Sequence, residues 1–227
     1  VLATDGSLYH IHLRGDQIAD NVILVGDPQR VGMFKPMFSA VEYETLNREI
    51  HSITGSYKGK RITVLSTGMG TDNIDIVVTE LDACVNIDLK TREELPNKRV
   101  LNLVRLGTCG CFQKEIDINQ YVASKYVVGI DGIMYFYKNK EGVLIKKLSD
   151  EFTQYMDWSK DLPTPYGVEC SNGLLEKIAF EAGKTYKCYF QILPTDGYIF
   201  PVKKDEFSVT INNESANIVN FSSKLVY

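Results

Sequence analysis

Residues Arg61–Gly70 read RITVLSTGMG, and this stretch indicates the class of fold. It begins with a run of mostly apolar or β-branched residues, as in a buried strand, and stops at a turn with two glycines. The residues that follow carry apolar side chains at helical spacing: Ile74, Val77, Val78, Leu81 and Val85. A buried strand followed by such a helix is the repeating unit of α/β proteins, so we expect an α/β fold.

The same alternation of strands and helices extends along the chain. Asn21–Gly26 (NVILVG) is an apolar run that stops at a turn, and Pro28 suits the first turn of a helix. Arg99–Gly107 is interpreted as a central strand. Further strands are expected at Ser39–Asn47, Glu49–Gly59, Ile118–Ile130, Thr185–Leu193 and Phe207–Ile211. Further helices are expected at Ser171–Gly183 and from near Asn212, and charged loops at Asp88–Arg99 and Tyr137–Glu151. Residues 1–227 are expected to form one domain, a mixed sheet flanked by helices.

The composition argues against several classes of protein. The net charge of -4 comes with no basic stripe, so we expect no nucleic-acid partner. The sequence has no run of roughly 18 apolar residues that would span a membrane, and VLATDGSLYHIHL lacks the features of a signal peptide. The 5 scattered cysteines favour a reducing compartment, so a cytoplasmic location is expected. Cys109 and Cys111 form the only close pair, and with only 3 histidines in the chain we expect no metal site.

Three of the predicted strands end in turns with the chemistry of an anion site. The first turn, Gly26–Arg30, offers a glycine backbone and the start of a helix, although Asp27 could simply cap that helix. The second turn, Ser66–Thr71, offers hydroxyl groups and two glycines. The third follows Arg105 and contains Thr108. Ligands of open α/β sheets gather beyond the carboxyl ends of the strands, so these turns favour one shared site.

Arg105 is the most unusual residue of this set because it lies in an apolar run that predicts a buried strand. A buried guanidinium group needs an anionic partner. That partner is either a bound oxyanion or a carboxylate in a structural ion pair, for which the candidates are Asp27, Asp131 and Glu214. Arg30 in another of the turns, together with backbone amides, favours an oxyanion, most naturally phosphate.

Three motifs together carry a resemblance to a known family: Leu24–Val31 (LVGDPQRV), Ser66–Leu81 (STGMGTDNIDIVVTEL) and Leu103–Gly110 (LVRLGTCG). In their order and spacing they resemble the nucleoside phosphorylases, especially the uridine phosphorylase branch. The resemblance implies a single α/β domain with a mixed, partly barrel-like sheet, assembled as a homodimer or as a hexamer built from dimers. It also implies a pentosyl-transferring enzyme of nucleotide salvage. Such an enzyme cleaves a nucleoside with phosphate as its co-substrate and uses no cofactor.

The resemblance assigns phosphate-binding roles to five residues. Four match positions that hold phosphate within one subunit: Gly26, Arg30, Arg105 and Thr108. Arg48 matches an arginine that reaches the phosphate from the neighbouring subunit. Because the reaction passes through a positively charged sugar, phosphate is both nucleophile and countercharge, and positioning and electrostatics do most of the catalysis.

The resemblance also assigns residues to the nucleoside. His10 matches a histidine that crosses the same interface to the ribose, and Glu214 matches a carboxylate that holds ribose hydroxyls. The ring of Tyr198 or Phe200 would flank the base, and Asn213 stands where a methionine packs on the ribose. The resemblance also assigns Thr108 to substrate binding. The expected catalytic residues are Arg30, Arg105, Glu214 and His10.

The match to the family is weaker toward the C-terminal end. Val202 and Lys204 stand where the uridine branch carries the glutamine and arginine of its base pocket. Valine cannot pair with an amide edge, and lysine lacks the planar fork of arginine. Asn212 replaces the first carboxylate of the ribose motif. Compared with the family, a C-terminal strand and helix are expected to be missing from residues 1–227.

The leading hypothesis is phosphorolysis of a nucleoside, with uridine as the expected substrate, to a free base and ribose 1-phosphate. The alternative is a catalytically impaired paralogue that binds phosphate or nucleoside, or stabilises an oligomer. A nucleosidase, which uses water, is disfavoured because such relatives generally lack the set of Arg30, Arg48 and Arg105.

Overall fold

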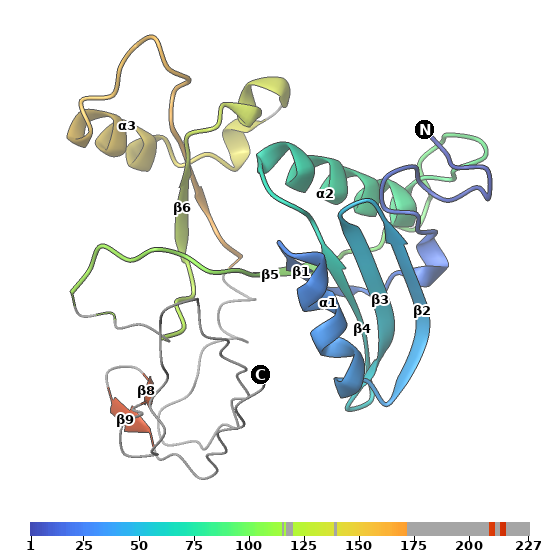
Figure 1. The fold of residues 1–227 in the computed structure, drawn as a ribbon. Coiled ribbons are helices and arrows are strands. Elements are labelled where there is room, and N and C mark those ends of the chain that lie inside the picture. Colours follow the sequence, from blue (N-terminus) through green and yellow to red (C-terminus); the bar gives the residue numbers. More distant parts are fainter. Residues whose placement is uncertain (115, 117–119, 139, 172–208, 212–213, 217–227) are drawn as a thin grey trace.

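The computed structural model describes residues 1–114, 116, 120–138, 140–171, 209–211 and 214–216 (Figure 1). At its centre is a five-stranded sheet with the order β2-β3-β4-β1-β5. The strands are β1 (Asn21–Val25), β2 (Ala40–Asn47), β3 (Ile50–Tyr57), β4 (Lys60–Ser66) and β5 (Asn102–Leu106). The helices that pack on it are α1 (Pro28–Phe34) and α2 (Thr71–Asn86). β1 runs parallel to β4 and β5, whereas β3 runs antiparallel to β2 and β4, so the sheet is mixed as expected.

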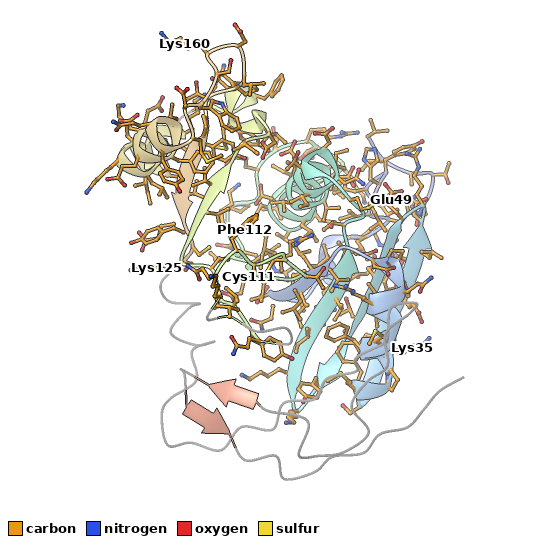
Figure 2. All side chains as sticks on the ribbon, turned by 60° about the vertical axis from the view of Figure 1, so that its left-hand side comes forward. Lys35, Glu49, Cys111, Phe112, Lys125 and Lys160 are labelled. Carbon is orange, nitrogen blue, oxygen red and sulfur yellow. The ribbon has the colours of Figure 1, made fainter. Side chains whose placement is uncertain are left out.

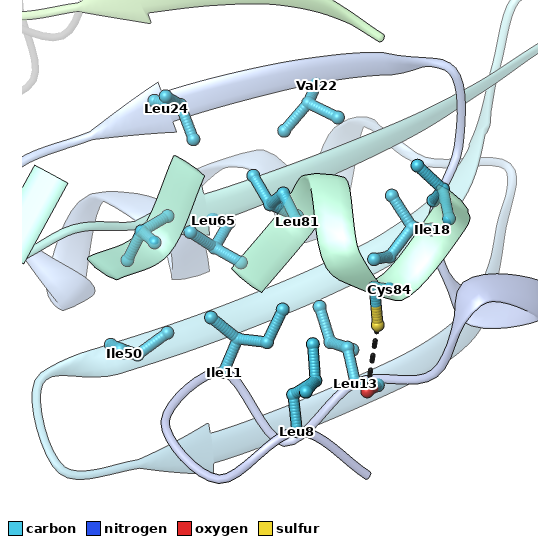
Figure 3. Close-up of a cluster of buried hydrophobic side chains, with 12 residues drawn as sticks. Leu8, Ile11, Leu13, Ile18, Val22, Leu24, Ile50, Leu65, Leu81 and Cys84 are labelled. Atoms are coloured by element: carbon cyan, nitrogen blue, oxygen red, sulfur yellow. Dashed lines mark hydrogen bonds between the residues drawn. The ribbon is translucent and has the colours of Figure 1, made fainter. Parts of the chain in front are cut away.

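Helices cover both faces of the sheet around β1. Leu24 of β1 belongs to a buried cluster with Leu81 of α2, part of which Figure 3 shows. The next residue, Val25, belongs to a second buried cluster with Val31 of α1. Because side chains alternate along a strand and both faces are covered, β1 appears in the sequence as a continuous apolar run. This arrangement confirms the predicted α/β class with helices on the faces of a mixed sheet.

The N-terminal segment completes the core on the α2 side of the sheet. Its apolar side chains are buried in the same cluster as α2: Leu8, Ile11, Leu13 and Ile18. Cys84 of α2 donates its thiol hydrogen to the carbonyl oxygen of Leu13 at 3.0 Å, the dashed line in Figure 3. Burial raises the pKa of the Cys84 thiol to about 12, so this thiol stays protonated at neutral pH. Cys84 is therefore a structural residue of the core.

The two strand–turn–helix units predicted from the sequence are confirmed. α1 begins at Pro28, and Asp27 caps it by accepting a hydrogen bond from the amide of Gln29 at 2.8 Å. α2 begins directly after Gly70, and three of its predicted apolar positions are fully buried: Val77, Leu81 and Val85. Short 3-10 helices lie at η1 (Gly15–Gln17) and η2 (Lys35–Met37).

Arg105 contradicts one prediction about the sheet. β5 is the last strand in the order of the described sheet, not a central one, and Arg105 and Leu106 at its end are exposed. The expectation that Arg105 is buried is therefore wrong. Its charge is accessible to solvent in this chain, and the cost of burying an unpaired guanidinium does not apply to it.

A second group of elements follows β5. β6 (Tyr126–Gly129) pairs antiparallel with β7 (Tyr166–Glu169), and α3 (Lys146–Tyr155) packs beside them. η3 (Ile133–Phe136) and η4 (Lys140–Gly142) lie between β6 and α3. The predicted charged loop Tyr137–Glu151 is wrong in its last part, which forms the first turns of α3. Pairs of opposite charge four residues apart, such as Lys146 and Asp150, support that helix.

The C-terminal predictions have mixed outcomes. β8 (Val209–Ile211) confirms the core of the strand expected at Phe207–Ile211. The prediction of a helix from near Asn212 is wrong at Glu214–Ala216. These residues form the strand β9, which pairs antiparallel with β8. The elements expected at Ser171–Gly183 and Thr185–Leu193 lie outside the described residues, apart from Ser171. None of the helices in the described ranges has the length and apolar character that crossing a membrane requires.

Candidate functional site

The carboxyl ends of the three parallel strands lie level with one another. Val25, the last residue of β1, is paired with Ser66 of β4 on one side and with Leu106 of β5 on the other. The turns that follow these strands therefore leave the same edge of the sheet, which we call the carboxyl edge. They are Gly26–Pro28, Thr67–Gly70 and Gly107–Thr108. The register of the sheet confirms the expectation that these three turns lie together.

The guanidinium group of Arg105 lies across two of these turns. A Cβ atom built on Gly107 would lie 2.5 Å from its Nη1 atom, and one built on Gly26 would lie 3.7 Å from its Nη2 atom. Gly107 thus leaves room that a larger residue would take from Arg105. The pairing of β1 with β5 brings the ends of these strands together, and the guanidinium group of Arg105 places a positive charge beside both ends.

Arg105 has no carboxylate partner among the described residues. Two of the candidate partners are engaged elsewhere: Asp27 caps α1, and Asp131 accepts hydrogen bonds from the hydroxyl of Tyr166 at 3.0 Å to each of its oxygens. The side chain of Glu214 lies outside the described residues. The described residues therefore offer no structural ion pair for Arg105, and its guanidinium group can bind an anion.

Arg30 and Thr108 lie beside the same edge. Arg30 is in α1, directly after the first turn, is partly exposed, and forms no ion pair within the described ranges. Thr108 is exposed in the turn after β5. The backbone contributes less than expected, because the amide of Gln29 is already bound by Asp27. The charge at this edge therefore comes from side chains, Arg30 and Arg105, more than from helix amides.

A hairpin turn brings Arg48 to the carboxyl edge. Arg48 and Glu49 connect β2 and β3, and β3 begins where β4 ends, as the hydrogen bond from the His51 amide to the Ser66 hydroxyl at 2.7 Å shows. Figure 2 labels Glu49 at this end of the hairpin. Arg48 has a φ of 54°, which is uncommon outside glycine and fits a tight hairpin turn. The side chain of Arg48 is exposed.

The N-terminal segment places His10 next to Arg48. The guanidinium carbon of Arg48 lies 5.7 Å from the centre of the Tyr9 ring, and the rings of Tyr9 and His10 pack edge to face at 5.1 Å. Asn47 donates hydrogen bonds to the carbonyl oxygens of Tyr9 and His10 at 3.2 and 2.8 Å. The two residues that the resemblance assigns to a neighbouring subunit's site therefore lie on one part of the molecular surface. We call it the Arg48 surface: the exposed Tyr9 and Arg48 and the partly exposed His10 and Asn47.

Glu80 of α2 orients His10. Its Oε1 atom lies 2.6 Å from Nδ1 of His10, and its Oε2 atom accepts hydrogen bonds from the amides of His10 and Ile11 at 3.1 and 3.0 Å. A carboxylate only accepts, so the proton of the imidazole is held on Nδ1. In the neutral ring Nε2 is then an acceptor, suited to a hydroxyl hydrogen. We did not single out Glu80 from the sequence, because its contact with His10 joins positions 70 residues apart.

Gly68 is required where the second turn leaves the sheet. Its φ is +71°, and a Cβ atom there would lie 2.7 Å from Nδ2 of Asn73 and from Cγ of Glu49. Asn73 donates a hydrogen bond to Oε1 of Glu49 at 3.1 Å, which ties the start of α2 to the Arg48 turn. The glycine therefore permits the contact between the second turn and the hairpin.

The comparison with family models decides the family. A model of the phosphorylase superfamily matches residues 20–183. The chain belongs to this superfamily. The match runs across all the turns of the carboxyl edge and confirms the family expected from the three sequence motifs.

The relatives of this phosphorylase chain are nucleoside phosphorylases. It is 37% identical over 114 residues to the DeoD-type purine nucleoside phosphorylase of Alkaliphilus metalliredigens, covering 50% of this chain and 43% of the relative. It is 35% identical over 114 residues to the DeoD-type enzyme of Bacillus subtilis, with the same shares covered. The chain thus spans less than half the length of these curated relatives.

A solved structure extends the likeness over more of the fold. The chain superposes on a nucleoside phosphorylase of Trypanosoma brucei that shows uridine phosphorylase activity, with a TM-score of 0.64 and 25% identity. The superposition covers 78% of this chain and 60% of that one. It supports the assignment of the mixed sheet and its flanking helices to the nucleoside phosphorylase fold.

Several expected site residues cannot be placed. Tyr198, Phe200 and Asn213, and the divergent positions Val202, Lys204 and Asn212, lie outside the described residues. Glu214 is described only as part of the backbone of β9. The residues that the structure brings together are therefore those of the carboxyl edge, Gly26, Arg30, Arg105 and Thr108, with the Arg48 surface at the adjoining hairpin.

In the reaction that the resemblance implies, replacing Glu80 with glutamine is expected to raise the KM for nucleoside about threefold to tenfold, with little change in phosphate affinity, because His10 loses its fixed orientation. Steady-state kinetics with each substrate varied in turn would measure the two effects. Glu93→Gln, in an exposed loop, is the matched control and should leave both values unchanged. An equal loss of affinity for both substrates would contradict this role of Glu80.

Proposed function

We propose that this chain binds inorganic phosphate at the carboxyl edge and uses it to cleave the glycosidic bond of a nucleoside, releasing a free base and ribose 1-phosphate. The observation that carries the proposal is the guanidinium group of Arg105, which lies across the glycine turns Gly26 and Gly107 without a carboxylate partner in the described residues. Arg30 supplies a second positive charge beside the end of the adjacent strand.

The chemistry requires little beyond positioning and charge. As the glycosidic bond breaks, the sugar becomes positively charged and electrons move to the departing base. Phosphate held by Arg30, Arg105 and Thr108 would attack the anomeric carbon and would offset that charge. Phosphate is then a co-substrate, and the proposal includes no cofactor or metal. Arg30 and Arg105 are proposed as catalytic residues because they touch this reacting group.

The proposed assembly is a homodimer or a hexamer in which sites are shared across an interface. The Arg48 surface supports it: the exposed Arg48 and the partly exposed His10 lie together on one side of the chain. In the assembly, Arg48 would reach the neighbour's phosphate, and Nε2 of His10 would accept a hydrogen bond from a ribose hydroxyl. Glu214 would hold ribose hydroxyls, Tyr198 or Phe200 would flank the base, and Asn213 would lie against the ribose.

The proposed substrate is uridine. The Trypanosoma brucei relative with uridine phosphorylase activity supports this choice, since its likeness covers 78% of the chain. The purine nucleoside phosphorylases of bacteria support inosine as the second candidate. A cytoplasmic location is proposed because the four cysteines in the described ranges are free: Cys84, Cys109, Cys111 and Cys170.

The test is release of free base from uridine, thymidine and inosine, each with and without phosphate, followed by chromatography. We expect phosphate-dependent release of uracil from uridine. Phosphate-dependent release of hypoxanthine alone would move the assignment to purines, and release without phosphate would replace it with hydrolysis. If no base is released, calorimetry with inorganic phosphate identifies the alternative, a catalytically impaired paralogue that still binds phosphate.

A further inference from the structure

We propose that His51 is a positioning residue, held as an imidazolium between Glu44 and the carbonyl group of Pro28, that fixes the start of α1 for phosphate binding. The inference rests on the proposed function, because α1 is the helix that carries Arg30. We call this contact the His51 bridge: Glu44, His51 and the Pro28 carbonyl.

The His51 bridge joins two separate parts of the fold. His51 is in β3, its side chain is 17% exposed, and its Nδ1 atom lies 3.1 Å from the carbonyl oxygen of Pro28. On the other side of the ring, Nε2 lies 3.1 Å from Oε1 of Glu44 in β2. Glu44 and His51 lie diagonally across the hairpin, since His51 pairs with Leu46. The ring therefore connects the hairpin to the first residue of α1.

Both partners of the ring accept hydrogen bonds and neither donates. The backbone carbonyl of Pro28 has no hydrogen to give, and proline has no amide hydrogen either. Hydrogen bonds from Lys35, at 2.5 Å, and from His51 hold the pKa of the Glu44 carboxyl below its ordinary value, so this group is ionised at neutral pH. A neutral imidazole carries only one N–H group and would leave one of the two contacts without a hydrogen. The observed geometry is satisfied at both ends only by the doubly protonated ring.

Among the residues that the structure describes, few groups face His51. From β2 the ring meets the carboxylate of Glu44, which also binds the ammonium group of Lys35 in η2. From α1 it meets the neutral carbonyl of Pro28, and from β4 the neutral hydroxyl of Ser66 accepts a hydrogen bond from the backbone amide of His51. The positive charge of the ring is thus matched by one carboxylate that it shares with Lys35.

The position of Pro28 gives the bridge its effect on the site. Pro28 lies two residues after Gly26 and two before Arg30, so a bond to its carbonyl holds the segment on which both phosphate-binding positions lie. When the side chain of His51 is replaced, its contacts to Glu44 and Pro28 are lost, and the start of α1 is held less firmly. Phosphate affinity should then fall.

The experiment uses the full chain and the variants His51→Gln and Glu44→Gln. Calorimetry with inorganic phosphate at pH 6 should show about threefold to tenfold weaker binding for both variants, the loss expected for one charge-assisted hydrogen bond acting through the backbone. The ratio of the wild-type and variant affinities, measured in the same buffer, is the quantity compared. His12→Asn is the matched control, since His12 lies outside the bridge and its φ of 50° suits asparagine.

A second measurement tests the bridge without any ligand. NMR at pH 6 should show both ring N–H hydrogens of His51 slowed in exchange with solvent, and Glu44→Gln should accelerate the exchange of the Nε2–H hydrogen. Only one such resonance, or none, would overturn the bridge. Wild-type phosphate affinity in a folded His51→Gln variant would overturn the positioning role alone. If the wild-type chain binds no phosphate, the proposed function fails, and the two N–H resonances still decide whether the bridge exists.

Discussion

Replacing Arg105 with methionine is expected to lower kcat/KM for phosphorolysis by about 100- to 1,000-fold, the loss typical when one group that stabilises the transition state is removed. Methionine keeps much of the length of the side chain but removes the charge that lies across Gly26 and Gly107. Because Arg105 is exposed, the melting temperature should change little. Steady-state kinetics with phosphate varied, together with a thermal melt, would measure both effects.

The control for Arg105 is a second exposed arginine away from the carboxyl edge. Arg92 lies in the loop after α2 and forms no ion pair with a described residue. Arg92→Met removes the same charge and should leave kcat/KM within about twofold, since lone exposed charges contribute little. Arg105→Lys should recover only part of the activity, because lysine cannot bind phosphate through two parallel hydrogen bonds. An Arg105→Met variant within threefold of wild type would remove the main support for the proposed site.

Replacing Leu81 with alanine is expected to lower the free energy of unfolding by about 2 to 5 kcal/mol. Leu81 is fully buried in α2 at the centre of the cluster that joins this helix, β1 and the N-terminal segment. Alanine would leave a cavity that its neighbours cannot fill without moving. Urea unfolding followed by circular dichroism would measure the loss.

The control for Leu81 is an apolar residue of the adjoining turn. Met69 is 91% exposed, and Met69→Ala should change the free energy of unfolding by less than about 0.5 kcal/mol. The Leu81 variant should also weaken nucleoside binding, because the neighbouring Glu80 orients His10. A loss of stability below about 1 kcal/mol would show that the core around α2 can close the cavity, contrary to the packing described.

The parts of the fold that sequence patterns predict are those in which local signals agree. In Arg61–Asn86 an apolar β-branched run, a glycine turn and helical spacing all indicate the same strand and helix, and both are present as β4 and α2. The Asp27-Pro28 pair similarly predicts the start of α1. These elements also lead into the turns of the carboxyl edge, so much of the proposed phosphate site follows from local sequence.

The failures arise where distant parts of the chain decide the outcome. The apolar run around Arg105 predicts a buried strand, but whether a strand lies inside a sheet or at its end depends on which other segments pair with it. Glu80 and His10 are 70 residues apart, and no local pattern indicates their contact. The first turns of α3 had a local signal that we missed: Lys and acidic residues four positions apart, as in Lys147 and Glu151.

The two edges of the central sheet face different constraints during divergence. At one edge Arg105 lies beside Gly26 and Gly107, and Glu49 of the Arg48 hairpin lies beside Gly68, so a change in the length of one of these loops disturbs a contact with its neighbour. At the opposite edge the hairpin between β3 and β4 turns at Lys58 and Gly59, two exposed residues with open space around Gly59. Relatives of this chain should therefore tolerate insertions at that hairpin, and an affinity tag or fluorescent label placed there should leave the chemistry intact.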